Sequence, residues 1–185
     1  MFITDMQWGE QPVRLTALAV RELPQDAPTT SVHIVAFQGE RVLVVRDRRG
    51  AFGFPGGRLE EGESYEAALE REVYEEARAR LKPEKILFAV LKIEWTQRLA
   101  HRTYPYDYSY MAMYTGQIRA LEPIGADPAG VITGRDLFTC ADCERLLPEN
   151  NRILLRQALC ALSARPEAYR RTLRAFAAML REGRK

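Results

Sequence analysis

Residues 57 to 79 read GRLEEGESYEAALEREVYEEARA, and this stretch decides the fold. It is rich in Ala, Leu and Glu, which are strong helix formers. Ser64 is a good N-cap residue, so the sequence predicts a helix that begins behind it. On this helix Glu72, Glu75 and Glu76 stand at i, i+3 and i+4 and share one face. Three carboxylates on one face repel one another unless a cation lies among them.

Such a glutamate face suits a divalent cation. Mg²⁺ and Mn²⁺ prefer carboxylate, water and phosphate oxygens, so the helix could hold a metal that in turn binds a diphosphate. We expect Glu72 and Glu76, one turn apart, to be the principal ligands, with Glu75 as a third. The alternative is an ordinary solvated acidic face. The preceding loop at 53–57, GFPGG, and the fixed spacing favour the metal site.

The spacing resembles the signature of the Nudix hydrolases, G-x5-E-x7-R-E-U-x-E-E-x-G-U, in which U is a bulky aliphatic residue. The first glycine, all the charged positions and the first U match, namely Gly57, Glu63, Arg71, Glu72, Val73, Glu75 and Glu76. The last two positions differ, because Arg78 replaces the second glycine and Ala79 the final aliphatic residue.

This resemblance implies an α/β fold in which a mixed, curved sheet is sandwiched between helices. It implies one Nudix domain over 1–185, with an N-terminal strand and linker at 1–29, a core at 30–148 that contains the signature 57–79, and C-terminal helices at 149–185. It also implies a set of site residues. The catalytic candidates are Glu72, Glu75, Arg71 and Glu63, and the metal candidates are Glu72, Glu75, Glu76 and the carbonyl of Gly56. Arg58 is a candidate for substrate binding, and the tyrosine spacing described below adds Tyr106 and Tyr108.

The end of the helix is a separate question because Arg78 stands where the family has glycine. A β-carbon in the left-handed conformation that ends a helix costs about 1 kcal/mol, so Arg78 predicts that the helix continues. Pro83 is the next natural stop. An apolar stripe continues at i+4 through this point, formed by Leu69, Val73, Ala77 and Leu81.

The remaining chain reads as strands followed by helices. Strands are expected at 14–20, 30–37, 41–46, 86–95 and 110–118, with a hairpin at Gln38-Gly39-Glu40. A helix is expected from Glu149 to Ser163, capped by Asn150 or Asn151, and a second one opens at Pro166. The second carries Tyr169, Leu173, Phe176 and Leu180 at helical spacing, and this stripe is expected to pack within the chain rather than in a dimer.

Composition excludes several classes of protein. A net charge of +2 on 185 residues does not indicate a nucleic-acid surface, and no signal peptide or membrane-length apolar run is visible, so a cytoplasmic location is expected. Three cysteines suit a reducing compartment. Cys140 and Cys143 form one C-x-x-C, but two further ligands at similar spacing are missing, and no zinc is expected.

Substrate choice is the least determined property. Four tyrosines recur at every second residue, Tyr104, Tyr106, Tyr108 and Tyr110, and could line a wall on which a base stacks, or could pack as an aromatic loop edge. Arg98, His101 and Arg102 could contact phosphate or be loop charges. An acidic residue from a later loop could join the site, and Asp107, Glu122, Asp127 and Asp136 remain open.

The sequence therefore favours a Mg²⁺-dependent hydrolase, with Mn²⁺ as a possible substitute. It would cleave a phosphoanhydride in a nucleoside diphosphate linked to another group, with nucleoside or deoxynucleoside triphosphates favoured, by attack of water on phosphorus. A non-hydrolytic nucleotide sensor is the alternative, and an isomerase acting on an allylic or homoallylic diphosphate is a third. No nucleic-acid polymer or membrane is expected as partner, and the chain could be a monomer or a homodimer.

Overall fold

The structure, a computed structural model, describes residues 2–8, 11–20, 22–97, 106–125, 127–164, 167 and 169–182. The strands are β1 (Ile3–Trp8), β2 (Gln11–Leu18), β3 (Thr29–Gln38), β4 (Arg41–Asp47), β5 (Phe52–Gly53), β6 (Gly56–Arg58), β7 (Ala79–Trp95), β8 (Tyr108–Leu121) and β9 (Ile132–Phe138). The helices are α1 (Tyr65–Ala77), α2 (Cys140–Leu146), α3 (Glu149–Leu162) and α4 (Arg170–Glu182).

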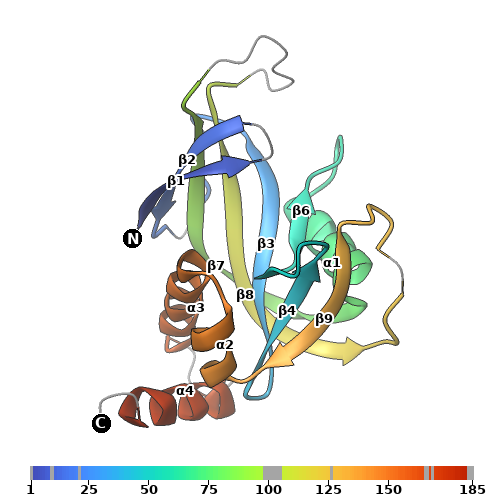
Figure 1. Ribbon diagram of the computed structural model, residues 1–185, viewed down its shortest axis with the longest axis vertical. Helices are drawn as coiled ribbons and strands as arrows, with labels where there is room; N and C mark the ends of the chain where they lie inside the picture. Colours follow the sequence, from blue (N-terminus) through green and yellow to red (C-terminus); the bar gives the residue numbers. More distant parts are fainter. Residues whose placement is uncertain are drawn as a thin grey trace.

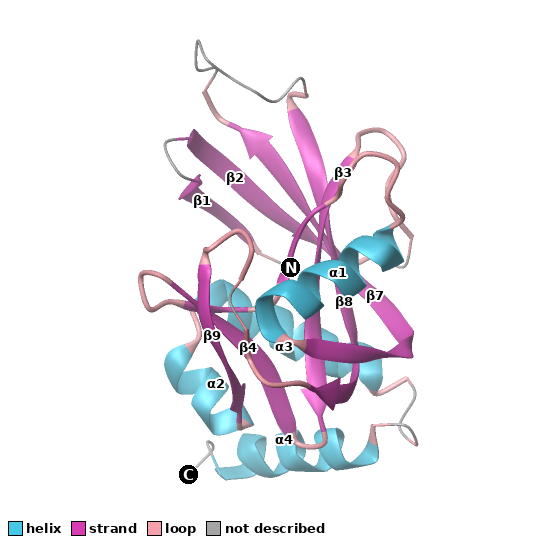
Figure 2. Cartoon of the chain, turned by 90° about the vertical axis from the view of Figure 1, so that its right-hand side faces the viewer, coloured by secondary structure: helices cyan, strands magenta, loops and turns pink. Residues whose placement is uncertain are grey.

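One curved sheet contains all the strands and lies between helices (Figures 1 and 2). Its order is β1-β2-β7-β8-β3-β4-β5, with β6 added beside β3 and β9 beside β4. The sheet is mixed because β3 and β8 run parallel, whereas the other pairs are antiparallel. The predicted fold, a mixed curved sheet sandwiched between helices, is confirmed.

Each face of the sheet has its own apolar core. On one face α1 buries Leu69 and Val73 against Val32 and Ile34 of β3. On the other face α3 buries a stripe that includes Leu155 against β3 and β8. Since successive strand residues point to opposite faces, β3 contributes to both cores, and its hydrophobic residues form a nearly continuous run.

The β-rich segments became strands; most are longer than expected, whereas β2 begins and ends earlier than the expected 14–20. The hairpin at Gln38-Gly39-Glu40 is confirmed, with Gln38 paired to Arg41. Sequence reasoning missed β1, β9 and α2, and it read as a loop the segment that contains the short strands β5 and β6. The strand β9, ITGRDLF, contains a glycine and two charges, and α2 has only seven residues and depends on a capping box between Thr139 and Asp142.

The prediction that the signature helix continues beyond Arg78 is wrong. Ser64 caps the helix as expected, but α1 ends at Ala77, and Arg78 takes the left-handed conformation at φ 46° and ψ 38°. Its backbone N–H donates to the Tyr74 carbonyl at 2.9 Å, and its carbonyl accepts from the Glu122 N–H at 2.9 Å. Pro83 lies inside β7, at an irregularity in the pairing with β8 where no ladder N–H is needed.

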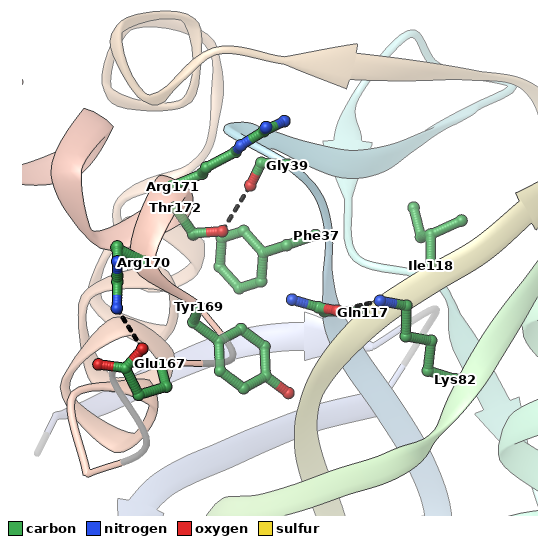
Figure 3. A pocket seen from close by; sticks show the side chains of 10 residues that line it. All are labelled: Phe37, Gly39, Lys82, Gln117, Ile118, Glu167, Tyr169, Arg170, Arg171 and Thr172. Carbon is green, nitrogen blue, oxygen red and sulfur yellow. Dashed lines mark hydrogen bonds and ion pairs between the residues drawn. The ribbon is translucent and has the colours of Figure 1, made fainter.

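The start of α4 lies near the end of the sheet that carries the β3–β4 hairpin, where Tyr169 and Thr172 approach Phe37 and Gly39 (Figure 3). Tyr169 is buried, and Leu173 and Phe176 pack against the core beneath it, so the expected packing within the chain is confirmed for these three residues. The Thr172 hydroxyl donates to the Gly39 carbonyl. Pro166 lies outside the described residues.

Three smaller findings complete the fold. The α3 N-cap is Pro148, which offers no side-chain hydrogen bond, so capping by Asn150 or Asn151 was wrong. Cys140 and Cys143 are buried free thiols in α2, and burial raises the pKa of the Cys143 thiol to about 12. In the described part of the chain no helix is both long and apolar enough to cross a membrane.

Candidate active site

The glycines before the helix place the chain backbone directly against the glutamate face. Gly56 has φ 146°, and a β-carbon there would overlap the Val32 carbonyl and His33, which pairs with Gly56 across β3 and β6. At Gly57 a β-carbon would overlap the carboxylate of Glu72. Only glycine allows this close approach, so the GG pair is what brings β6 to the glutamates of α1.

Arg71 ties the signature residues together. It makes a two-pronged ion pair with Glu63, with Nε at 2.9 Å from Oε1 and Nη2 at 2.8 Å from Oε2. Its Nη1 lies 2.8 Å from Glu72 Oε1 and 3.6 Å from Glu75 Oε2, and Nη2 donates to the Arg58 carbonyl at 2.9 Å. The guanidinium therefore links the loop, the helix N-terminus and the glutamate face.

The contacts with Arg71 change the pKa values of the carboxylates of Glu63 and Glu72. Hydrogen bonds from Arg71 lower the pKa of Glu63, which keeps it ionised. Burial raises the pKa of Glu72, and the hydrogen bond and charge of Arg71 oppose that rise. Glu75 is the more open of the two glutamates that contact Arg71 on the helix face, with 32% of its side chain exposed against 14% for Glu72.

Glu76 is held differently. Its Oε2 accepts the Gly56 N–H at 3.0 Å, and no Lys or Arg of the described residues forms an ion pair with it. Burial raises the pKa of Glu76 to about 8, and the charges of Glu72, Asp127 and Glu75 add to the rise. A buried carboxylate with acidic neighbours and no cation is costly to ionise.

The donor set fits a hard divalent cation by its chemistry. The oxygens of Glu72, Glu75 and Glu76 are of the kind that Mg²⁺ and Mn²⁺ bind, and the raised pKa of Glu76 shows a buried position that lacks a compensating positive charge. The Glu72 carboxylate is hydrogen-bonded to Arg71, and the Glu76 carboxylate is hydrogen-bonded to the Gly56 N–H. Within the described ranges, no group of three or more His, Cys, Asp or Glu side chains is arranged so that it could hold a metal ion.

Of the four later acidic residues, Asp127 is the one whose charge acts on Glu76. Its carboxylate also accepts the N–H groups of its own loop, including Val131 at 2.7 Å and Ile132 at 2.8 Å. Glu122 is bound instead by the Tyr74 hydroxyl at 2.8 Å and by Arg80.

The three described tyrosines of the alternating run lie in two different settings. Tyr106 is exposed at a bend, whereas Tyr108 and Tyr110 lie on β8. Both strand hydroxyls donate to Asp26, at 2.9 and 3.0 Å, and the two rings form an edge-to-face pair. Lys92 Nζ lies 4.1 Å from the Tyr108 ring centre. Tyr104 lies outside the described residues, as do Arg98, His101 and Arg102.

A cavity of about 160 Å³ adjoins the Gly56-Gly57-Arg58 strand on the face of the sheet opposite α1. Its walls include Ile93, Trp95, Ser109 and Thr30. Sequence reasoning did not single out these residues. The available signal was two hydroxyl residues and a tryptophan near the ends of otherwise apolar strands, which becomes meaningful only once the strands are paired.

The comparison with protein families agrees with this geometry, since the NUDIX domain matches residues 27–151, more than half of the chain. The chain belongs to the Nudix family. The matched region contains the whole signature helix, the loop before it and the strands that carry them. A search of curated proteins finds no match.

Solved structures of Nudix proteins share the fold. A Bacillus subtilis pyrophosphohydrolase, BsRppH, in an E68A mutant, has a TM-score of 0.58 at 22% identity over 85% of this chain and 95% of that one. The NUDIX domain of Shewanella oneidensis NrtR, in complex with ADP ribose, has a TM-score of 0.56 at 22% identity over 74% and 90%. A Nitrosomonas europaea NUDIX hydrolase has 0.55 at 21% over 72% and 90%.

Proposed function

We propose that this protein is a hydrolase that depends on a divalent cation, Mg²⁺ or Mn²⁺. Its substrate would be a nucleoside diphosphate linked to another group, with nucleoside and deoxynucleoside triphosphates as the first choice. Water would attack phosphorus and break the phosphoanhydride bond. The observation that carries this proposal is the network in which Arg71 joins Glu63 to the helix glutamates while the Gly56 and Gly57 backbone lies against them.

The contacts support the following proposed roles. Glu72, Glu75, Glu76 and the Gly56 carbonyl would hold the metal, which when bound would polarise the phosphate and stabilise the developing negative charge. Arg71 and Glu63 would keep the glutamates oriented, because Arg71 reaches both groups at hydrogen-bond distance. Glu75, the more exposed of the two glutamates beside Arg71, would accept a proton from the attacking water. Arg58 would contact substrate phosphate at the mouth of the cavity.

A second candidate is a nucleotide sensor that binds without hydrolysis. The observation in its favour is the likeness to the NrtR NUDIX domain, whose structure holds ADP ribose. The complete set of signature glutamates favours the enzyme, because a sensor has no need for a metal-binding face.

The test is a substrate panel with product identification by mass spectrometry. The purified chain would be incubated with Mg²⁺ and with nucleoside triphosphates, dinucleotides, nucleotide sugars and coenzymes, in parallel with EDTA. The proposal expects at least one substrate to be cleaved at a phosphoanhydride, and cleavage to stop in EDTA and return with added Mg²⁺ or Mn²⁺. Full turnover in EDTA would exclude the metal mechanism. Tight binding of a panel member without cleavage would support the sensor.

A further inference from the structure

Two of the candidate metal ligands, Glu75 and Glu76, lie in the last turn of α1, which ends at Ala77. The C-terminal end of a helix carries a partial negative charge, so carboxylates there are disfavoured. The last turn of α1 has no basic residue of its own that could offset this charge. Stabilisation of this end of the helix must therefore come from another part of the chain.

Arg135 of β9 supplies a positive charge at the end of α1, beside which β9 runs in Figures 1 and 2. Its Nη1 donates to the carbonyls of Ala77 and Arg78, the latter at 3.1 Å, and its Nη2 donates to the Glu122 carbonyl at 2.6 Å. Basic side chains that bind the last carbonyls of a helix satisfy acceptors which the helix itself leaves free. Here the donor comes from a strand 58 residues after Ala77, so it also fixes the helix end to the sheet.

The guanidinium of Arg135 is committed to these backbone groups. The residue is half-buried, and burial lowers the pKa of Arg135. Among the described residues no carboxylate forms an ion pair with it. A partly buried cation without an acidic partner is costly unless its donors are hydrogen-bonded, so the three carbonyls are what hold this side chain in place.

On the helix side, the contact lies next to a candidate ligand. Ala77 directly follows Glu76, whose Oε2 accepts the Gly56 N–H at 3.0 Å. Glu72 stands one turn earlier on the same helix. Because Arg135 holds the carbonyl beside Glu76, a shift of the helix end would change how Glu76 lies relative to Glu72 and Gly56.

On the other side, the contact fixes the start of the connection between β8 and β9. Glu122 is the first residue after β8, and Asp127 further along accepts the Ile132 N–H at 2.8 Å where β9 begins. The charge of Asp127 contributes to the raised pKa of Glu76, so the two carboxylates act on each other through space. Arg135 thus bonds to both segments that bring acidic groups to the candidate site.

We propose that Arg135 is a positioning residue for the divalent cation, which holds the end of α1 against β9 so that Glu76 stays aligned with Glu72 and the Gly56 backbone. The inference rests on the proposed function and deepens it, because it gives a residue outside the signature the task of keeping the last signature glutamate in place. Arg135 itself would contact neither the metal nor the substrate.

The first measurement uses the metal alone. Mn²⁺ is titrated into the full chain without substrate, and the free ion is followed by electron paramagnetic resonance. Arg135→Met removes the charge and the donors, and we expect it to raise the Kd for Mn²⁺ about tenfold, as for groups that orient metal ligands without binding the metal. Arg135→Lys, which keeps the charge but not the planar fork, should recover most of this affinity, to within about threefold of the wild type.

The control is Arg152→Met. Arg152 is a partly buried arginine of α3, on the opposite face of the sheet, and its Nη1 also donates to a backbone carbonyl, that of Glu144, at 3.2 Å. This variant should lose stability in urea unfolding, as Arg135→Met does, but should bind Mn²⁺ like the wild type. The comparison separates a general loss of stability from a misplaced glutamate.

The second measurement is amide hydrogen exchange in the metal-free protein. The Gly56 N–H is bonded to Glu76, whereas Arg135 bonds to Ala77, Arg78 and Glu122, so Gly56 reports on Glu76 and not on the substituted side chain. We expect Arg135→Met to raise the exchange rate of Gly56 about five- to tenfold relative to Val35, a buried residue of β3 that reports unfolding of the whole chain. Arg152→Met should leave this ratio unchanged.

The outcomes are distinguishable. Wild-type Mn²⁺ affinity in Arg135→Met would overturn the proposal, as would an equal loss of affinity in Arg152→Met. If Arg135→Met does not fold, Arg135→Lys takes its place, and an unchanged Kd together with an unchanged Gly56 exchange ratio would overturn the proposal. A wild-type chain that binds no Mn²⁺ would overturn it as well. A chain that binds Mn²⁺ with the expected dependence on Arg135 but cleaves nothing on the substrate panel would retain the role of Arg135 and reject the hydrolase.

Discussion

Glu76 shows how one residue can have opposite effects on stability and on the proposed function. Its carboxylate is buried, accepts one backbone N–H, and has acidic neighbours that together with burial raise its pKa to about 8. The folded protein therefore retains a proton that the unfolded chain releases above an ordinary pKa of 4.5. Since the folded state binds more protons in this window, the stability of the metal-free protein should fall as pH rises from 4.5 to 8.

Replacing Glu76 by Gln should remove this pH dependence. Glutamine keeps the oxygen that accepts the Gly56 N–H but carries no charge. In EDTA we expect Glu76→Gln to be more stable than the wild type at pH 8, by on the order of 1 to 3 kcal/mol, and nearly equal to it at pH 4.5. Urea unfolding at both pH values measures the difference. Glu66→Gln, an exposed position on the same helix, should show no such pH-dependent gain.

The same substitutions should abolish the proposed catalysis. Glu72→Gln and Glu76→Gln preserve shape and remove the charge that would hold the metal, so kcat should fall by about a hundredfold to a thousandfold. Steady-state kinetics with Mg²⁺ on the substrate from the panel tests this, with Glu66→Gln as the control. Wild-type turnover in both variants would show that the glutamate face is not the metal site.

At the scale of elements, the end of α1 shows that tertiary contacts can force a helix to stop at a residue that disfavours it. Arg78 adopts a left-handed conformation that costs about 1 kcal/mol for a residue with a β-carbon. Its backbone groups bond to Tyr74 and Glu122, and its guanidinium lies 4.8 Å from the centre of the Tyr74 ring. The chain can then enter β7 at Ala79, paired with Leu121 of β8.

Two variants separate the strain from the contact. Arg78→Ala and Arg78→Gly both lose the packing on Tyr74, but only alanine keeps the β-carbon. We expect Arg78→Gly to be more stable than Arg78→Ala by about 1 kcal/mol and to lie close to the wild type, because relief of strain offsets the lost cation–π contact. Thermal or urea unfolding measures this order. Equal stability of the two variants would mean that Arg78 is not strained.

At the scale of the whole molecule, the sheet separates stabilising contacts from the candidate active site. Tyr169 and Thr172 anchor the C-terminal segment at the β3–β4 hairpin, where Figure 3 shows them around a cavity of about 500 Å³. Gly39, just after β3, is six residues from His33 of that strand, which pairs with Gly56 in the candidate site. That separation is roughly 20 Å.

Changes at this distant end should therefore affect stability alone. Tyr169→Ala removes a buried aromatic side chain and should cost about 3 kcal/mol or more of unfolding free energy. KM and kcat should stay near wild type at temperatures where the variant remains folded. Tyr169→Phe, which keeps the ring, should lose far less. A large change in KM for Tyr169→Phe would show that the two ends are coupled.

Much of this architecture was predictable because the relevant forces are local. Runs of β-branched residues specified β3 and β4, and Gly39 marked the hairpin between them. Ser64 and the helix-forming residues behind it determined where α1 begins. The spacing of Glu72, Glu75 and Glu76 placed them on one helix face whatever the rest of the chain did.

Long-range contacts decided what the sequence by itself could not. The helix stops before Arg78 because the Arg78 carbonyl accepts from the Glu122 N–H, just after β8, and Ala79 pairs with Leu121 of β8, which no local propensity encodes. The strand β9 forms because β4 offers it an edge, although its own pattern is weak. The residues that line the cavity beside β6 come from β3, β6, β7 and β8, and only strand pairing brings these strands together. The amino-acid sequence determined which residues could carry the chemistry, whereas the tertiary structure decided what lies beside them, because neighbours across a sheet are selected by packing and hydrogen bonding of the whole chain.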